Sequence, residues 1–236
     1  MKNQTGYGAS IIVSGKALEE HPFGGSTYIE AAPGQEFAVH VEGPPRSKFL
    51  AVISIDGLNI LDGNSATVTG PGYVVWVSQN IRAWKLPGNR DGAQFVFTPQ
   101  HHSYAAESGR PENTGVISIV LFAPKLRAHD FQHFDFDERR APLKFGAESF
   151  LKGGGMGTEF GRRVNFQTTQ VKFERGEEVA RFTFRYDHPD ALQIAGIIQA
   201  KNPLGYEVDA WPEDTKAAAA AGCVAPAGWT GGQKED

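Results

Sequence analysis

The chain has 236 residues, of which 40% are hydrophobic and 21% are charged. Its 28 glycines and 14 prolines make up 42 of these residues, above the share in ordinary globular chains but below that of low-complexity sequence. The formal net charge is −4, and no basic run is longer than two residues. This composition excludes collagen-like and disordered chains, and it lacks the basic stripe of a nucleic-acid-binding protein.

Cysteine content and hydropathy point to a reducing compartment. Cys223 is the only cysteine, so the chain cannot form an internal disulfide. The first ten residues lack the apolar core of a signal peptide, and no apolar run approaches the roughly 20 residues that span a bilayer. We therefore expect a protein made in the cytoplasm, without a membrane partner.

The first 125 residues have a hydrophobic period of two, which predicts β-strands. Turn signals rich in Gly, Pro, Asn and Asp separate the strands, and no helical stripe of ten residues interrupts them. Residues 49–55 are apolar throughout, which indicates a strand buried on both faces. The other predicted strands cover residues 37–41, 73–77, 80–86, 93–98 and 116–122. Many short strands with close turns predict an all-β fold, a mostly antiparallel sandwich or jelly roll with little helix.

Composition changes after residue 124. We expect residues 1–125 to be the sandwich core and residues 126–165 to be an irregular, Gly-rich connector that includes the glycines at 153–155 and 157. Residues 166–212 are expected to add strands at 169–173 and 180–186 and one short helix. That helix begins with Pro189, is capped by His188 or Asp187, and ends at Gly196. Residues 213–236 predict an extended C-terminal arm.

Three stretches, together with a block of matching residues between Gly157 and Leu192, resemble a β-sandwich family found in bacteria and in tailed-phage genomes. The first stretch is FLAVISIDGLNILDG at residues 49–63, the second surrounds Tyr73 and Trp84, and the third runs from Ser103 to Val116. The resemblance covers roughly residues 27–198 and departs from the family at Ala83 and Ser118, where glycine is more usual. The matching residues are Ser54, Asp56, Gly57, Leu58, Asn59, Gly63, Gly72, Tyr73, Arg82, Trp84, Ser103, Tyr104, Ala105, Ala106, Asn113, Gly115, Val116, Gly157, Thr158, Gly161, Phe173, Glu174, Arg175, Tyr186, Asp187 and Leu192.

This resemblance implies a fold and a setting more than an activity. Some phage proteins with such domains decorate or cement capsids. The resemblance therefore implies a virion location after assembly in the host cytoplasm, with other capsid or virion proteins as partners and a homo-oligomeric state.

Candidate metal ligands are few. His129 and His133 are spaced i, i+4 and would share one face of a helix, a two-ligand pattern for zinc or iron. The aromatic residues between and after them equally fit an anchored loop. Asp56 and Asn59 follow a buried strand and fit either a turn or part of a Ca²⁺ shell, but the sequence supplies no further ligands for that shell. We expect no cofactor.

Aromatic residues are the best candidates for a non-enzymatic binding site. Tyr73 and Trp76 lie on a predicted strand and would stack on a sugar or anchor a protein, or else belong to the core together with Trp84. Trp211 and Trp229 lie in a polar, Ala- and Pro-rich tail without a local core, so we expect them to contact a neighbouring subunit.

No nucleophile elbow or phosphate-binding loop is present in the sequence. We therefore expect a non-enzymatic structural protein, and the resemblance implies that it decorates or cements a phage capsid. The alternatives are a carbohydrate-binding module that uses Tyr73 or Trp76, and a metal-dependent enzyme that uses His129 and His133.

Overall fold

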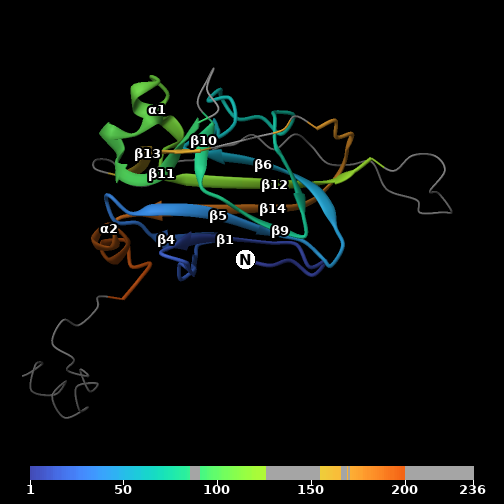
Figure 1. The fold of residues 1–236 in the computed structure, drawn as a ribbon. Helices are drawn as coiled ribbons and strands as arrows, with labels where there is room; N and C mark the ends of the chain where they lie inside the picture. The colour runs from blue at the N-terminus through green and yellow to red at the C-terminus, as the bar shows by residue number, and fades with distance from the viewer. Residues whose placement is uncertain (86–90, 126–154, 166–168, 170, 200–236) are drawn as a thin grey trace, which may run out of the picture. The chain divides into compact units, whose positions relative to one another are not determined.

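The fold is a sandwich of two β-sheets, seen in a computed structural model that describes residues 1–85, 91–125, 155–165, 169 and 171–199. One sheet, sheet A, has the order β10-β11-β5-β1-β2. In addition, β13 pairs with β11, and β9 pairs with β5. The other, sheet B, has the order β3-β4-β14-β12-β6-β7, with β8 also paired to β6. All pairs are antiparallel except β4 with β14. Residues Met1–Gln199 form one compact unit (Figure 1).

Most strands are short and follow one another closely along the chain. The strands of sheet A are β1 (Gly8–Val13), β2 (Lys16–Ala17), β5 (Glu36–Glu42), β9 (Ser78–Ile81), β10 (Ala83–Lys85), β11 (Asp91–Pro99) and β13 (Met156–Asn165). The strands of sheet B are β3 (His21–Phe23), β4 (Ser26–Glu30), β6 (Lys48–Ile55), β7 (Leu58–Asn59), β8 (Tyr73–Trp76), β12 (Val116–Pro124) and β14 (Arg175–Asp187). The predicted all-β sandwich is confirmed.

The core lies between the two sheets. The rings of Phe37 and Phe97 on sheet A stack at 4.1 Å, and Phe97 also meets Tyr186 of sheet B at 5.0 Å. Strand β14 alternates as its sequence predicts, with Phe182 and Phe184 buried and Thr183 exposed. Strand β6 is buried on both faces, because Leu50 and Val52 form a second apolar cluster on the side away from the core.

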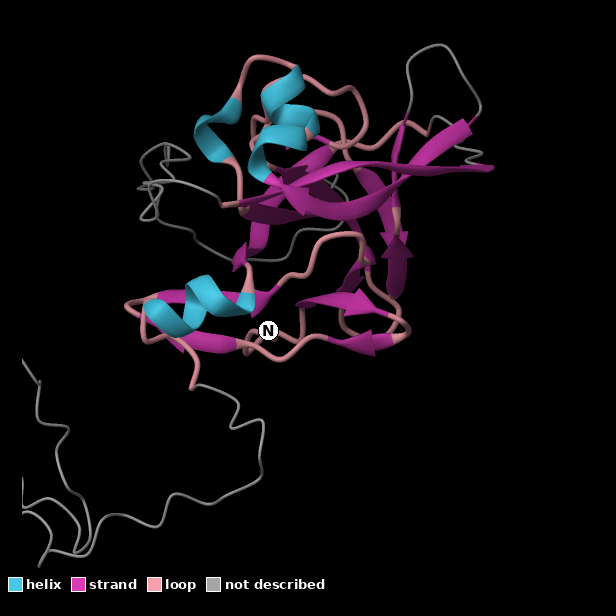
Figure 2. Ribbon diagram, turned by 90° about the vertical axis from the view of Figure 1, so that its left-hand side faces the viewer, coloured by secondary structure: helices cyan, strands magenta, loops and turns pink. Residues whose placement is uncertain are grey.

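The helices are short and lie at one end of the sandwich, on the left of Figure 1 and facing the viewer in Figure 2. They are the 3-10 helices η1 (Gln100–His102) and η2 (Pro111–Asn113), and the α-helices α1 (Tyr104–Glu107) and α2 (Pro189–Ile194). As predicted, α2 has Pro189 in its first turn, His188 as its N-cap and Gly196 at φ +69° just beyond its end.

The prediction of an irregular connector over residues 126–165 is wrong for Met156–Asn165, which form β13 at the edge of β11. Glycine in this strand reflects close packing rather than a loop, because a Cβ at Gly157 would lie 2.5 Å from Cβ of Ser103. The remainder of that connector, residues 126–154, lies outside the described residues, as does the predicted arm at 213–236.

Two strand predictions and one domain boundary also need correction. Residues 171–173 are not in a strand, and β14 begins instead at Arg175. The strand predicted for residues 80–86 is split between β9 and β10, because residues 78–81 pair with β5 and residues 83–85 pair with β11. Strand β14 lies inside sheet B between β4 and β12, so the core is not complete at residue 125.

Asp56 and Gly57 form the two-residue turn of the β6–β7 hairpin, with φ of +53° and +77°. Positive φ at both positions is typical of a type I′ turn, for which Asp-Gly is a preferred sequence. The turn predicted for these residues is therefore confirmed. The turn also packs tightly, since a Cβ at Gly57 would lie 2.7 Å from Cβ of Asn113.

We expect Gly57→Ala to lower the free energy of unfolding by about 2 to 3 kcal/mol, through an unfavourable φ and a steric clash together. Gly15→Ala is the matched control, because Gly15 has φ +78° but open space around the added methyl. It should cost about 1 kcal/mol in the same urea titration. Equal losses in the two variants would show that the contact with Asn113 carries no energy.

Candidate functional site

The Asp56 carboxylate is the most enclosed charged group among the described residues, with 1% of its surface exposed. It accepts hydrogen bonds from the Gly115 amide at 2.9 Å, the Thr158 amide at 2.7 Å and the Tyr186 hydroxyl at 2.6 Å. These donors come from the residue just before β12, from β13 and from β14. One carboxylate at a hairpin turn therefore joins three other segments, drawn from both sheets.

Burial and hydrogen bonding act in opposite directions on this group. Burial raises the pKa of Asp56 to about 7, although the bonds from Tyr186, Thr158 and Gly115 favour the ionised form. Burial, followed by the charge of Asp56, raises the pKa of Tyr186 well above its ordinary value, so its hydroxyl keeps its proton and stays a donor. The Thr158 hydroxyl lies 2.8 Å from the Tyr186 hydroxyl and completes the cluster.

A second carboxylate, Asp187, closes the same junction. It accepts a hydrogen bond from the His188 amide at 2.8 Å and another from the backbone of Met156. Burial raises the pKa of Asp187, and its backbone bonds partly offset that effect. Asp56 and Asp187 thus bind alternate residues, Thr158 and Met156, at the start of β13. We call these four residues together with Tyr186 the carboxylate seam.

The role of the Asp56 carboxylate within the carboxylate seam is structural. A general acid or base must come within hydrogen-bond reach of its substrate. Asp56 is enclosed and already accepts from three donors, so it has no open approach for a reactant. The seam holds an edge strand of sheet A against the end of sheet B.

Many residues that carry the family resemblance meet around this seam. Asn113 packs against the backbone of Gly57, and the Tyr104 hydroxyl is 2.7 Å from the position of a Cβ at Gly63. Ser103 caps α1 by accepting from the Ala106 amide, directly beside Gly157. Sequence reasoning identified these residues as a pattern but did not predict that they meet.

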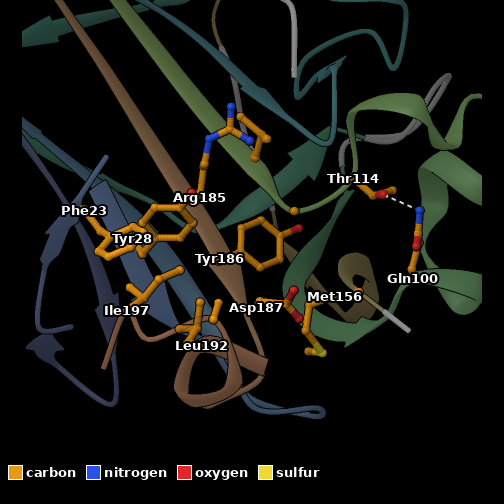
Figure 3. A pocket seen from close by; sticks show the side chains of 14 residues that line it. Phe23, Tyr28, Gln100, Thr114, Met156, Arg185, Tyr186, Asp187, Leu192 and Ile197 are labelled. Atoms are coloured by element: carbon orange, nitrogen blue, oxygen red, sulfur yellow. Dashed lines mark hydrogen bonds between the residues drawn. The ribbon is translucent and has the colours of Figure 1, made fainter. Parts of the chain in front are cut away.

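A cavity of about 330 Å³ lies next to the carboxylate seam (Figure 3). Phe23 and Tyr28 form one wall, and Leu192 and Ile197, from α2 and the residues that follow it, lie below them in this view. Gln100 lies on the far side and donates to the Thr114 hydroxyl at 2.7 Å. Arg185 of β14 also lines the cavity. Nothing in the sequence indicated this cavity, because its walls come from five distant segments.

A strained corner forms where the chain passes from β8 in sheet B to β9 in sheet A. Trp76 is 66% exposed and Val77 is 43% exposed. Val77 has φ +61°, a strained conformation for a β-branched residue, and Arg46 has φ +65°. The Val77 amide donates to the Ser47 carbonyl at 3.1 Å, and the Lys48 ammonium lies 4.8 Å from the Trp76 ring centre. We call Arg46, Lys48, Trp76 and Val77 the Trp76 corner.

The structure separates the aromatic residues that the sequence grouped. Tyr73 packs against the core, and burial raises the pKa of its hydroxyl, so Trp76 is the exposed aromatic residue of this pair. Trp84 is buried and makes edge contacts with Phe95 and Tyr104, in agreement with a core role. Trp211 and Trp229 lie outside the described residues, and their predicted partner contacts stay predictions.

The predicted metal ligands His129 and His133 also lie outside the described residues. Within the described part of the chain, no group of three or more His, Cys, Asp or Glu side chains is arranged to hold a metal ion. Asn59 does not face a cation, because its amide donates to the Pro71 carbonyl at 2.9 Å and its oxygen accepts from the Leu61 amide. In the same part of the chain, we find no helix with the length and apolarity needed to cross a membrane.

Comparison with known proteins adds no relative. No family model, no curated protein and no solved structure matches the chain.

Proposed function

We propose that this protein is a non-enzymatic structural subunit that assembles with other copies and with virion proteins, as a capsid-decorating or cementing protein of a tailed phage. The observation that carries the assembly role is the Trp76 corner, where a large indole is 66% exposed. Tryptophan and arginine are enriched at the energetic centres of protein interfaces. The resemblance of residues 27–198 to a phage-associated sandwich family supports the virion setting.

The backbone of the Trp76 corner supports the same role. Strained residues persist where the surrounding structure holds them and often lie at functional sites. Val77 is held by bonds on both sides, since its amide donates to Ser47 and its carbonyl accepts from the Gly43 amide at 2.7 Å. These bonds fix the corner before a partner arrives, so docking costs little ordering entropy.

We expect Trp76→Ala to weaken self-association by about 30-fold or more, the effect of truncating an interface hot spot. Native mass spectrometry of the full chain over a concentration series measures this directly. Phe23→Ala is the matched control, because Phe23 is an exposed aromatic residue on β3, at the opposite edge of sheet B from β8. A wild-type chain that stays monomeric at all concentrations, or a Trp76→Ala oligomer identical to wild type, would contradict self-assembly through this corner.

The virion setting has its own test. An antibody raised against the protein should label capsid particles in gold-labelled electron micrographs of phage-producing cells that carry the gene. Label found in the cytoplasm of those cells but not on capsid particles would contradict the virion location. The protein would then be an assembly protein of the bacterium.

A second candidate, a carbohydrate-binding module, is favoured by the same exposed indole and by the exposed polar side chains of Ser78, Gln79 and Asn80 that follow it. A planar ring beside hydrogen-bonding groups suits the apolar face of a sugar. This function predicts a monomer whose tryptophan fluorescence responds to a glycan, with the response lost in Trp76→Ala.

A further inference from the structure

We infer that the cavity beside the carboxylate seam binds a primary amine with an apolar body, with the protonated amine at Asp187. The cavity shares no lining residue with the Trp76 corner, and its ligand does not rest on the proposed assembly function. The volume of about 330 Å³ falls within the range of small-molecule pockets, which are mostly apolar with a few placed polar groups.

Asp187 differs from Asp56 because it reaches the cavity. Asp187 is 8% exposed, against 1% for Asp56, and it is one of the residues that line the cavity. In Figure 3 its carboxylate lies between Leu192 and Met156. It accepts hydrogen bonds from two backbone amides, those of His188 and Met156. A carboxylate has about four lone-pair sites, so Asp187 can accept from a further donor on a ligand.

The charge of Asp187 has no cationic partner that pairs with it in the described part of the chain. No Lys or Arg side chain there forms an ion pair with Asp187, and the His188 ring lies 3.4 Å from the Asp190 carboxylate instead. Burial therefore raises the pKa of Asp187, although the two amide bonds and the charge of His188 act in the opposite direction. An ammonium group on a ligand would supply the countercharge.

Gln100 adds a second acceptor to the lining of the cavity. Its Nε2 donates to the Thr114 hydroxyl at 2.7 Å, and that hydroxyl donates its own proton to the Pro111 carbonyl at 3.0 Å. These bonds fix the orientation of the Gln100 amide and place its Oε1 3.6 Å from the Cβ position of Gly155, another lining residue. A carboxylate and an amide oxygen both accept, so they favour a head group with several donors, such as an ammonium.

The apolar body of the ligand would contact side chains that have exposed surface to cover. Phe23 is 48% exposed, and Tyr28 and Ile197 are partly exposed. The three lie together on one side of the cavity in Figure 3, and removing their surface from water favours binding. Arg185 also lines the cavity, but in this view its guanidinium extends away from Asp187, so the two charges lie toward different ends of the site.

The test compares three probes with the same apolar body by isothermal titration calorimetry of the full chain at pH 7. The probes are 4-phenylbutylamine, 4-phenylbutan-1-ol and 4-phenylbutyrate, which are cationic, neutral and anionic. We expect the amine to bind the wild-type chain at least about 10-fold more tightly than the alcohol, and the carboxylate to bind most weakly. A carboxylate that binds as tightly as the amine would overturn the inference, and so would an amine that does not bind.

Asp187→Asn removes the charge at nearly the same shape. It should weaken binding of the amine by about 10- to 100-fold and binding of the alcohol by less than about 2-fold. Asp190→Asn is the matched control, because the Asp190 side chain is 79% exposed and lies outside the set of residues that line the cavity. Equal weakening of amine binding by the two substitutions would mean that Asp187 does not hold the ammonium.

A third variant tests the place of binding without changing any charge. Ala195→Trp puts a large ring into the cavity from the end of α2 and should abolish binding of the amine and the alcohol. Amine binding that survives this substitution would place the ligand elsewhere on the protein. The order of the three probes on the wild-type chain needs no variant, so the inference stays testable even if Asp187→Asn perturbs folding.

Discussion

Replacing Asp56 with alanine is expected to lower the free energy of unfolding by about 3 to 5 kcal/mol at pH 6. The substitution removes the shared acceptor of three buried donors, the amides of Gly115 and Thr158 and the hydroxyl of Tyr186. A buried donor left without a partner keeps its full desolvation cost, about 1 to 3 kcal/mol each before relaxation. Urea unfolding followed by circular dichroism measures the loss.

The matched control is Asp62→Ala. Asp62 is an exposed carboxylate in the loop that follows β7, and among the described residues it accepts from the Asn64 amide alone, at 3.0 Å. Its loss should cost no more than about 0.5 kcal/mol, as expected of an exposed polar contact. If Asp56→Ala costs as little as this control, the carboxylate seam does not hold the two sheets together.

The fold was largely predictable because its strands carry local signals. Residues 49–55, 93–98 and 180–186 each lie within an observed strand, since short runs rich in β-branched and aromatic residues, continuous or alternating with polar ones, favour strands. The Asp56–Gly57 turn was predictable for the same reason, because the two-residue loop has a strong sequence preference. Local patterns therefore specify elements but not which elements meet.

Strand β13 shows where local reasoning fails. The glycines at 153–155 and 157 predict a loop at its start, yet β11 offers it a partner edge over nearly its whole length. Gly157 is required by the approach of Ser103, a residue more than 50 positions earlier in the chain. A glycine that serves long-range packing has the same local appearance as one that serves a turn.

The site was less predictable than the fold. Asp56 was recognised as a turn residue, but its bonding partners Gly115, Thr158 and Tyr186 lie 59, 102 and 130 residues away. The one available signal was the resemblance, which grouped all four residues without indicating contact. Tyr73 and Trp76 lie three positions apart on the same short strand, so they face opposite sides of the sheet, and which side packs on the core could not be read from the strand alone.

The stability of this protein is expected to depend on pH through Asp56. Burial raises the folded-state pKa of Asp56 to about 7, whereas the exposed group in the unfolded chain titrates near 3.8. The folded state therefore holds a proton on this carboxyl between about pH 4 and pH 7, where the unfolded chain has released it. This contribution to stability is fully present below about pH 4, decreases as the pH rises, and is gone above about pH 7.

Asp56→Asn isolates this contribution because an amide of the same shape does not titrate. We expect the free energy of unfolding of wild type, minus that of Asp56→Asn, to fall by up to about 4 kcal/mol between pH 4 and pH 8. Asp187, whose pKa burial also raises, is present in both chains and largely cancels in the difference. A difference that rises with pH would mean that the bonds from Gly115, Thr158 and Tyr186 outweigh burial and hold the pKa of Asp56 below its ordinary value. The carboxylate seam would then be strongest when it is charged.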